Sequence, residues 1–154
     1  QLGRDVLSRV VNGARISLVV GIAVAVISIV IGLFLGLIAG YIRIMDAIIM
    51  RVMDGLMSIP AILLAIITVA VLGPGFINVI LVLALTRWPR YARVAYGQTL
   101  ALADRPFVRL SRAMGASTPR VLALHILPNI IGPLLVVATL EFGLMVLFEA
   151  GLSF

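Results

Sequence analysis

The chain has 154 residues, of which 63% are hydrophobic and 12% are charged, and its twelve basic residues give a net charge of +6. A soluble domain of this size carries about twice that fraction of charged residues, so the composition excludes a soluble globular protein. The absence of cysteine excludes disulfides and thiolate metal sites. Anionic membrane lipid accounts for the basic balance, and we expect no nucleic-acid partner.

Two long stretches of the sequence, residues 16–42 and 55–86, contain no charged residue. About 20 apolar residues suffice for a helix to cross the hydrocarbon core of a bilayer. Because a helix satisfies its own backbone hydrogen bonds in lipid, we expect an all-α, polytopic transmembrane helical bundle. We expect a single membrane domain over 1–154, incomplete at both ends, with about four spans at about 16–41, 56–72, 76–97 and 130–149.

The first predicted span follows an amphipathic segment, residues 1–15, which we expect to lie at the membrane interface. Four small residues recur in this span at intervals of four: Ser28, Gly32, Gly36 and Gly40. Small residues at this spacing form a groove in which another helix backbone can approach closely, so we expect tight helix packing along it. The alternative is that they are scattered glycines, which are common in membrane helices.

The segments between the next spans set the expected orientation. Residues 43–54 form a predicted amphipathic link, and Pro60 predicts a kink or a helix restart near the start of the second span. Residues 73–75, Gly-Pro-Gly, predict a tight turn before the third span. Most arginines lie in 43–54 and 87–120, and the turn has none. The positive-inside rule therefore places those two segments in the cytoplasm and the turn outside.

A basic segment rich in turn signals separates the third and fourth spans. Asp104 is a candidate N-cap for a helix that begins near Pro106, and Gly115 can end that helix in a left-handed conformation. Thr118, before Pro119, is the candidate N-cap of a second helix, which we expect to end at Pro128. The segment is thus predicted as helix, glycine turn and helix, with apolar side chains available for contact: Phe107, Val108, Leu110 and Met114. The alternative is a solvated loop whose arginines contact only lipid.

Residues 107–114 (FVRLSRAM) and 115–129 (GASTPRVLALHILPN) resemble the EAA loop of the membrane subunits of ABC importers. That pattern is Glu-Ala-Ala, three residues, Gly, nine residues, Ile, one residue and Leu-Pro, and Gly115 and Leu127-Pro128 match it. Four further motifs occur in the order expected for the dipeptide/oligopeptide/nickel permease subfamily: GRDVLSR (3–9), GARISL (13–18), WPRYAR (88–93) and EAGLSF (149–154). The resemblance covers nearly the whole chain.

By this resemblance, residues 104–128 form the cytoplasmic coupling loop, whose first helix sits in a groove of an ATPase subunit. The positions that the resemblance assigns to this contact are Phe107, Arg109, Leu110, Ser111, Met114, Gly115, Ala116 and Ser117. Two departures stand out, because Arg109, Leu110 and Ser111 replace the Glu-Ala-Ala and His125 replaces the Ile. The lost Glu affects the ionic part of the contact and not the apolar part. We expect His125 to have a packing or interface role, since the chain has no second His and no Cys.

Two ionisable residues, Arg87 and Glu141, lie within predicted spans. At 1.5 Å per residue each lies about 15 Å deep, counted from the external end of its span. An unpaired charge at this depth costs about 3 kcal/mol by insertion scales, so such residues pair or line a water-filled path. We expect Arg87 and Glu141 to approach each other. The alternatives are that Arg87 extends towards the interface beside Pro89, or that each residue faces the translocation path separately.

The resemblance implies a type I ABC importer permease-like fold and a subunit that moves di- or oligopeptides, with nickel or other small solutes as further candidates. It also implies two cytoplasmic ATPase subunits, a second permease subunit, an extracytoplasmic binding protein and a bacterial or archaeal inner membrane. We expect no bound cofactor and no enzymatic activity in this chain, because it has no phosphate-binding Gly-Lys-Ser/Thr loop and ATP is used by partners. The alternative is a passive channel or structural multi-pass protein whose basic loop anchors to lipid.

Overall fold

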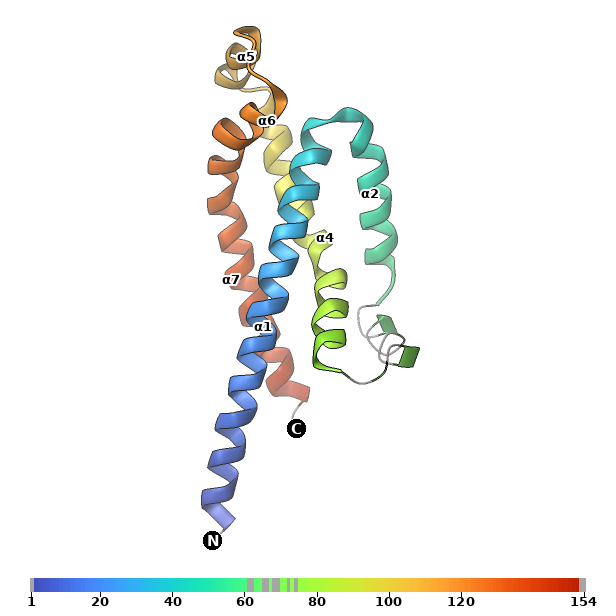
Figure 1. Ribbon diagram of the computed structural model, residues 1–154, viewed down its shortest axis with the longest axis vertical. Coiled ribbons are helices and arrows are strands. Elements are labelled where there is room, and N and C mark those ends of the chain that lie inside the picture. Colours follow the sequence, from blue (N-terminus) through green and yellow to red (C-terminus); the bar gives the residue numbers. More distant parts are fainter. Residues whose placement is uncertain are drawn as a thin grey trace.

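The computed structural model describes residues 2–60, 63–64, 67, 70–71, 73 and 75–152, and these residues form helices and turns without a strand. The helical elements are α1 (Leu2–Tyr41), α2 (Arg43–Ser58), α4 (Phe76–Ala103), α5 (Pro106–Ala113), α6 (Thr118–Val121), the π-helix η1 (Leu122–Ile126) and α7 (Leu127–Leu152). Helices α1, α4 and α7 pack together as a bundle, α2 runs back from the end of α1, and α5 lies at one end (Figure 1). The predicted all-α helical bundle is confirmed.

Within the described residues, two helical stretches are long and apolar enough to cross a membrane: Val10–Tyr41 and Thr118–Leu144. They correspond to the first and fourth predicted spans. Helix α4 contains three arginines, Arg87, Arg90 and Arg93. The number of spans therefore stays a prediction, although the helical membrane class follows from both stretches.

Helices α1 and α4 form the closest helix contact in the bundle. A Cβ atom placed on Gly36 would lie 2.5 Å from the Ala92 carbonyl oxygen and 2.6 Å from the Ala95 Cβ, which is closer than real Cβ atoms approach. The two backbones can meet at this distance only because no side chain stands between them. The other small residues of the four-residue stripe face α4 in the same way: Ser28, Gly32 and Gly40.

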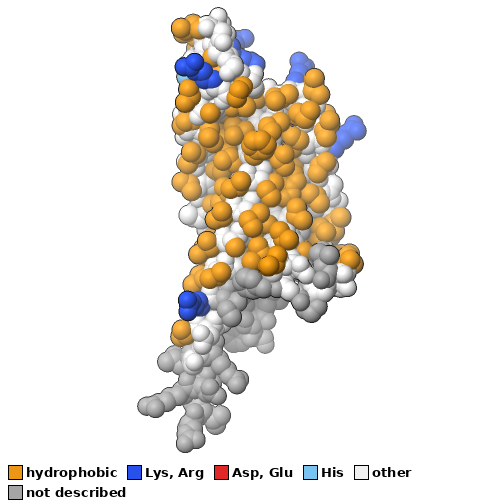
Figure 2. Space-filling model, in the orientation of Figure 1, with side chains coloured by type: hydrophobic (Ala, Val, Ile, Leu, Met, Phe, Trp, Pro, Cys, Tyr) orange, Lys and Arg blue, Asp and Glu red, His pale blue; other side chains and the backbone are white. Residues whose placement is uncertain are grey.

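The opposite side of α1 carries bulky apolar side chains that are exposed. They also recur every four residues, two positions out of step with the small-residue stripe: Leu18, Ile22, Val26, Val30 and Phe34. On the face drawn in Figure 2, hydrophobic side chains cover the middle of the molecule and the basic side chains lie towards its ends. An apolar band bounded by arginines is the surface that a helix bundle presents to lipid.

The predicted lead-in and first span are joined in the structure. Helix α1 runs without a break from Leu2 to Tyr41, so residues 1–15 do not form a separate interfacial helix where they are described. Residues 43–54, predicted as a link, are instead part of α2, and Ile42 alone separates α1 from α2. This prediction was wrong because the apolar side of the segment packs inward: Met53 is fully buried in a cluster with Trp88 and Ala92 of α4.

The predicted second span, 56–72, has a different start in the structure. Helix α2 begins at Arg43 and ends at Ser58, and Ile59 is extended with φ = −95° and ψ = 126°. The residue before a proline is disfavoured in helical geometry, so α2 ends before Pro60. The Leu63 N–H donates to the Pro60 carbonyl oxygen at 2.9 Å, so a new helical turn begins at Pro60, in agreement with the predicted restart and not with a kink. Beyond Pro60, most of this predicted span lies outside the described residues.

The helices that contain the last two predicted spans begin or end outside the predicted bounds. Helix α4 continues past residue 97 to Ala103, and α7 begins at Leu127 rather than at residue 130. The predicted spans end where the apolar sequence ends. A helix can continue beyond its apolar part as long as its backbone hydrogen bonds are made, so the helix and the span need not have the same ends.

Pro128 does not end the second helix of the basic loop, contrary to the prediction. Helices α6, η1 and α7 follow one another from Thr118 onwards without a gap. In η1 the turn is widened, and the Leu127 N–H donates to the Leu122 carbonyl oxygen. A π turn of this kind gives the proline ring room beside the preceding turn. The side chain of Asn129, next to Pro128, donates to the His125 carbonyl oxygen at 2.7 Å.

Candidate functional site

The basic loop is built as α5, a glycine turn and α6, in agreement with the predicted helix, turn and helix. Its caps differ from the prediction. Asp104 is the C-cap of α4, with φ = −93° and ψ = 0°, and the N-cap of α5 is Arg105. Likewise Ser117, not Thr118, is the N-cap of α6, and neither N-cap side chain makes a capping hydrogen bond. A proline in the first turn of each helix fixes φ at a helical value, which helps both helices begin without a side-chain cap.

Gly115 has φ = +86°, which confirms the predicted left-handed end of α5. The Gly115 N–H donates to the Arg112 carbonyl oxygen at 2.9 Å, and the Ala116 N–H donates to the Ser111 carbonyl oxygen at 3.1 Å. These two bonds form a Schellman motif, in which the left-handed residue turns the chain sharply out of the helix. The angle between α5 and the following helix is therefore set by the glycine.

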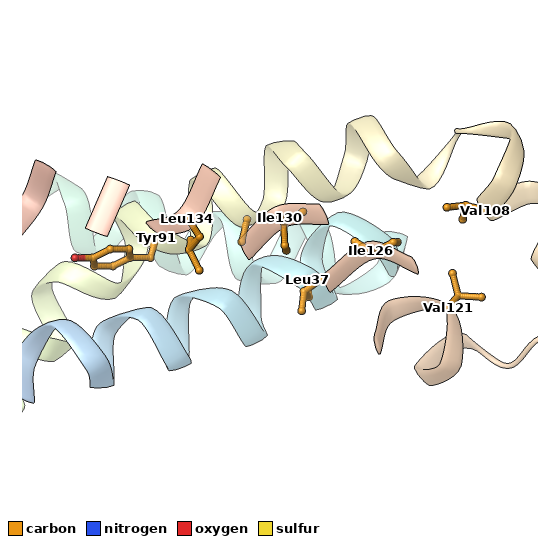
Figure 3. Close-up of a cluster of buried hydrophobic side chains, with 8 residues drawn as sticks. Leu37, Tyr91, Val108, Val121, Ile126, Ile130 and Leu134 are labelled. Atoms are coloured by element: carbon orange, nitrogen blue, oxygen red, sulfur yellow. The ribbon is translucent and has the colours of Figure 1, made fainter. Parts of the chain in front are cut away.

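Helix α5 has one apolar side that is buried and another that is exposed. Val108 is fully buried and faces Val121 inside a cluster that reaches into the bundle (Figure 3). The prediction that Val108 is available for a partner is wrong, because this residue holds α5 onto the bundle. Three other apolar side chains are exposed. Phe107 is 45% exposed and Leu110 is 63% exposed in α5, and Met114, the C-cap of α5, is 81% exposed.

The other residues assigned to the coupling contact by resemblance surround this exposed apolar surface. Arg109 and Ser117 are exposed, whereas Ser111 is half-buried. Ala116 is also half-buried and packs against the same cluster as Val108. The loop thus presents an apolar surface with a basic group where the resemblance leads us to expect an acidic one.

Three side-chain contacts fix the loop to the ends of the spans. The Ser111 hydroxyl and His125 Nε2 are 3.1 Å apart, and the rings of Phe107 and His125 meet edge to face with centroids 6.3 Å apart. The guanidinium carbon of Arg112 lies 4.5 Å from the centre of the Tyr41 ring at the end of α1. A cation over an aromatic face is attractive by about 0.5–1 kcal/mol at an exposed site. No pattern in the sequence indicates the contact between Arg112 and Tyr41, since the two residues are far apart in the chain.

The structure brings Arg87 and Glu141 together between α4 and α7. The Arg87 Nη1 lies 3.0 Å from Glu141 Oε2, and these side chains are 23% and 13% exposed. Arg90 donates to the other carboxylate oxygen at 2.7 Å and is 53% exposed. Sequence reasoning missed Arg90, although its spacing of three from Arg87 places both on one side of a helix. We call these three residues the charge cluster.

A small cavity lies beside the charge cluster. Its volume is about 10 Å³ and its lining includes Ser28 and Tyr91 in addition to Arg87 and Glu141. This is close to the space that one water molecule requires, and the lining offers polar partners to it. The Ser28 hydroxyl donates to the Ala84 carbonyl oxygen at 3.3 Å, so one polar lining group is already bonded.

A second ion pair on α4 lies nearer the end that carries α5. Arg93 Nη2 is 2.5 Å from Asp54 Oδ1 of α2, and the two side chains are 47% and 62% exposed. Ion pairs thus join α4 both to α7 and to α2. Among the residues that the structure describes, no group of three or more His, Cys, Asp or Glu could hold a metal ion.

The sequence of the chain matches those of known proteins. Residues 28–154 match the family model described as binding-protein-dependent transport system inner membrane component. The chain is 51% identical over 153 residues to a probable peptide ABC transporter permease protein, y4tQ, of Sinorhizobium fredii, covering 99% of this chain and 53% of that protein. It is 42% identical over 155 residues to the di/tripeptide transport system permease protein DppC of Pseudomonas aeruginosa, with 100% and 51% covered.

A third relative is the glutathione transport system permease protein GsiD of Shigella dysenteriae, which is 45% identical over 154 residues, with 99% of this chain and 51% of that protein covered. The chain spans about half the length of the curated relatives it matches.

Proposed function

We propose that this chain, which belongs to the family of binding-protein-dependent transport system inner membrane components, is part of the membrane subunit of an ATP-driven importer for di- or oligopeptides. The family match and the peptide names of the relatives support this proposal. The observation that carries it is the exposed apolar side of α5, because this side lies on a helix that is itself fixed to the spans.

The same loop explains how movement of a partner could reach the membrane. Contacts of α5 with Tyr41, Val121 and His125 join it to the end of α1 and to the helices that lead into α7. When two cytoplasmic ATPase subunits bind ATP and close, a helix seated on them moves with them. Because α5 cannot move far without these neighbours, its displacement is passed to the spans.

The remaining partners follow from the transport proposal. A second permease subunit completes the pathway, an extracytoplasmic binding protein delivers the peptide, and ATP hydrolysis takes place in the ATPase subunits. The chain lies in a bacterial or archaeal inner membrane and spans it several times. Arg109, which replaces the acidic residue of the EAA pattern, makes the ionic part of the ATPase contact opposite in sign.

A test of the docking surface uses Leu110→Asp. Leu110 is 63% exposed, so the substitution leaves the packing of the bundle intact while it places a charge on the apolar surface of α5. We expect membrane insertion to be normal and peptide uptake by the full transporter in proteoliposomes to fall at least about tenfold, since a charge buried without a partner costs more than 1.4 kcal/mol. Thr118→Asp is the matched control, because an acid is favourable in the first turn of α6. Normal uptake by the Leu110→Asp transporter would contradict the proposal.

A second test separates coupling from lipid anchoring. Gly115→Val puts a β-branched residue at φ = +86°, which costs about 1–2 kcal/mol and changes the angle of α5. Thr118→Val introduces the same side chain at the exposed start of α6, at a position that is not assigned to the ATPase contact and where a β-branched residue is already present. We expect Gly115→Val alone to reduce ATP-driven uptake, with both proteins inserted normally. If the loop served only to anchor lipid, both variants would behave like the original protein.

A further inference from the structure

The charge cluster carries more positive than negative charge. Arg87 and Arg90 contribute +2 and Glu141 contributes −1, which leaves +1, and both oxygens of the carboxylate are already in use at 3.0 Å and 2.7 Å. Arg90 lies about 20 Å from the Ala103 end of α4 at 1.5 Å per residue, well inside a bundle of this length. An uncompensated charge at this level in contact with lipid is unfavourable by several kcal/mol. The exposed half of Arg90 therefore faces something other than lipid.

The side of α4 that carries Arg90 is also unlike the lipid-facing side of α1. A row of exposed and half-exposed residues on this side, spaced three or four apart, is polar or small: Thr86, Arg90, Arg93, Gly97 and Ala101. One exposed leucine, Leu100, lies beside this row. By contrast, the exposed stripe on α1 consists of bulky apolar residues only. A polar and small surface at the level of the bilayer faces water or protein. This side of α4 thus has the character of a path lining.

We propose that the charge cluster is a carboxylate site in the translocation path, where Arg90 pairs with the C-terminal carboxylate of a peptide in transit. The inference rests on the proposed peptide transport and assigns a substrate group to specific residues. A carboxylate beside Arg90 neutralises the excess charge, and an arginine fork suits that group. Glu141 keeps Arg87 and Arg90 in place and competes for them, so that binding is weak enough for the peptide to leave.

The first arm of the test asks whether this side of α4 meets water. A Cβ on Gly97 would have nothing within 4 Å, so a side chain fits at this position. Because the 154 residues include no cysteine, Gly97→Cys adds one thiol at a known place. In the full transporter we expect a polar, membrane-impermeant thiol reagent to modify Gly97→Cys and not Phe34→Cys, which is on the lipid-facing stripe of α1. Absence of modification at position 97 would mean that protein covers this side, a carboxylate of the second permease subunit being the alternative partner, and would overturn the proposal.

The second arm asks whether the site recognises a carboxylate. A dipeptide with a free C-terminus and the same dipeptide with an amidated C-terminus are compared for how far they slow the modification of Gly97→Cys. We expect the free form to act at a concentration about tenfold lower, because one charge-assisted hydrogen bond accounts for a tenfold difference in affinity. We expect Arg90→Gln to remove this difference. Arg93→Gln is the matched control, because Arg93 is on the same side, is exposed to a similar extent and has its own partner in Asp54.

Each other outcome of the second arm counts against the site. Equal protection by the two dipeptides, no protection, or an equal loss in Arg90→Gln and Arg93→Gln would overturn the carboxylate assignment. Uptake of the free dipeptide by the unmodified transporter is measured separately. If uptake is absent, the proposed transport function fails, whereas the labelling of Gly97→Cys still reports on the character of the α4 surface.

Discussion

Gly36→Leu should separate α1 from α4 and destabilise the protein by about 3 kcal/mol or more. A Cβ at this position already lies 2.5 Å from a backbone oxygen of Ala92 and 2.6 Å from a side chain of Ala95. Backbone atoms cannot rotate away, so the helices themselves must move, and overpacking of this kind is among the more severe core changes. The free energy of unfolding is measured in mixed micelles by titration with denaturing detergent, with helical circular dichroism as the signal.

The matched control for this prediction is on the same helix. Gly13→Leu adds the same side chain to α1 where nothing lies within 4 Å of the new Cβ. Leucine favours helix over glycine by up to about 1 kcal/mol, so this variant should be as stable as the original protein or slightly more stable. If the two substitutions changed stability equally, the close approach at Gly36 would not be what holds α1 against α4.

The second large effect is expected for Glu141→Leu. This change leaves Arg87, which is 23% exposed, without its carboxylate partner in the interior of the bundle. Removal of one member of a buried pair costs more than the pair contributes, because an uncompensated charge stays behind, and we expect a loss of about 3 kcal/mol. The additional change Arg87→Leu should recover at least about 1 kcal/mol of this loss, measured by the same unfolding titration.

Asp54→Leu serves as the reference for an ion pair on the surface of the bundle. Asp54 is 62% exposed and its partner Arg93 is 47% exposed, so their contact contributes at most about 1 kcal/mol. A loss for Asp54→Leu as large as that for Glu141→Leu would show that the charge cluster has no special role in stability. Strict additivity of Arg87→Leu and Glu141→Leu would show that these two residues do not interact.

Local chemistry explains which parts of the loop could be predicted from the sequence. A glycine between two helical patterns has few uses other than a left-handed turn, and Gly115 adopts one. The cap at Asp104 was wrong because Pro106 can start a helix by itself, and the stop at Pro128 was wrong because a π turn accommodated the ring. In both places two local solutions existed, and packing around Val108 and Ile126 selected between them.

The sequence by itself determined the helical membrane class, the spacing of small residues along α1 and the presence of two opposite charges within apolar helical stretches. These properties follow from composition and from the helical period, which require no knowledge of neighbours. Only the tertiary structure decided which helix fills the groove of α1, that Arg90 shares Glu141 with Arg87, and that Arg112 lies over Tyr41. Such contacts join residues far apart in the chain, and their energies depend on how close the helices come once all of them pack together.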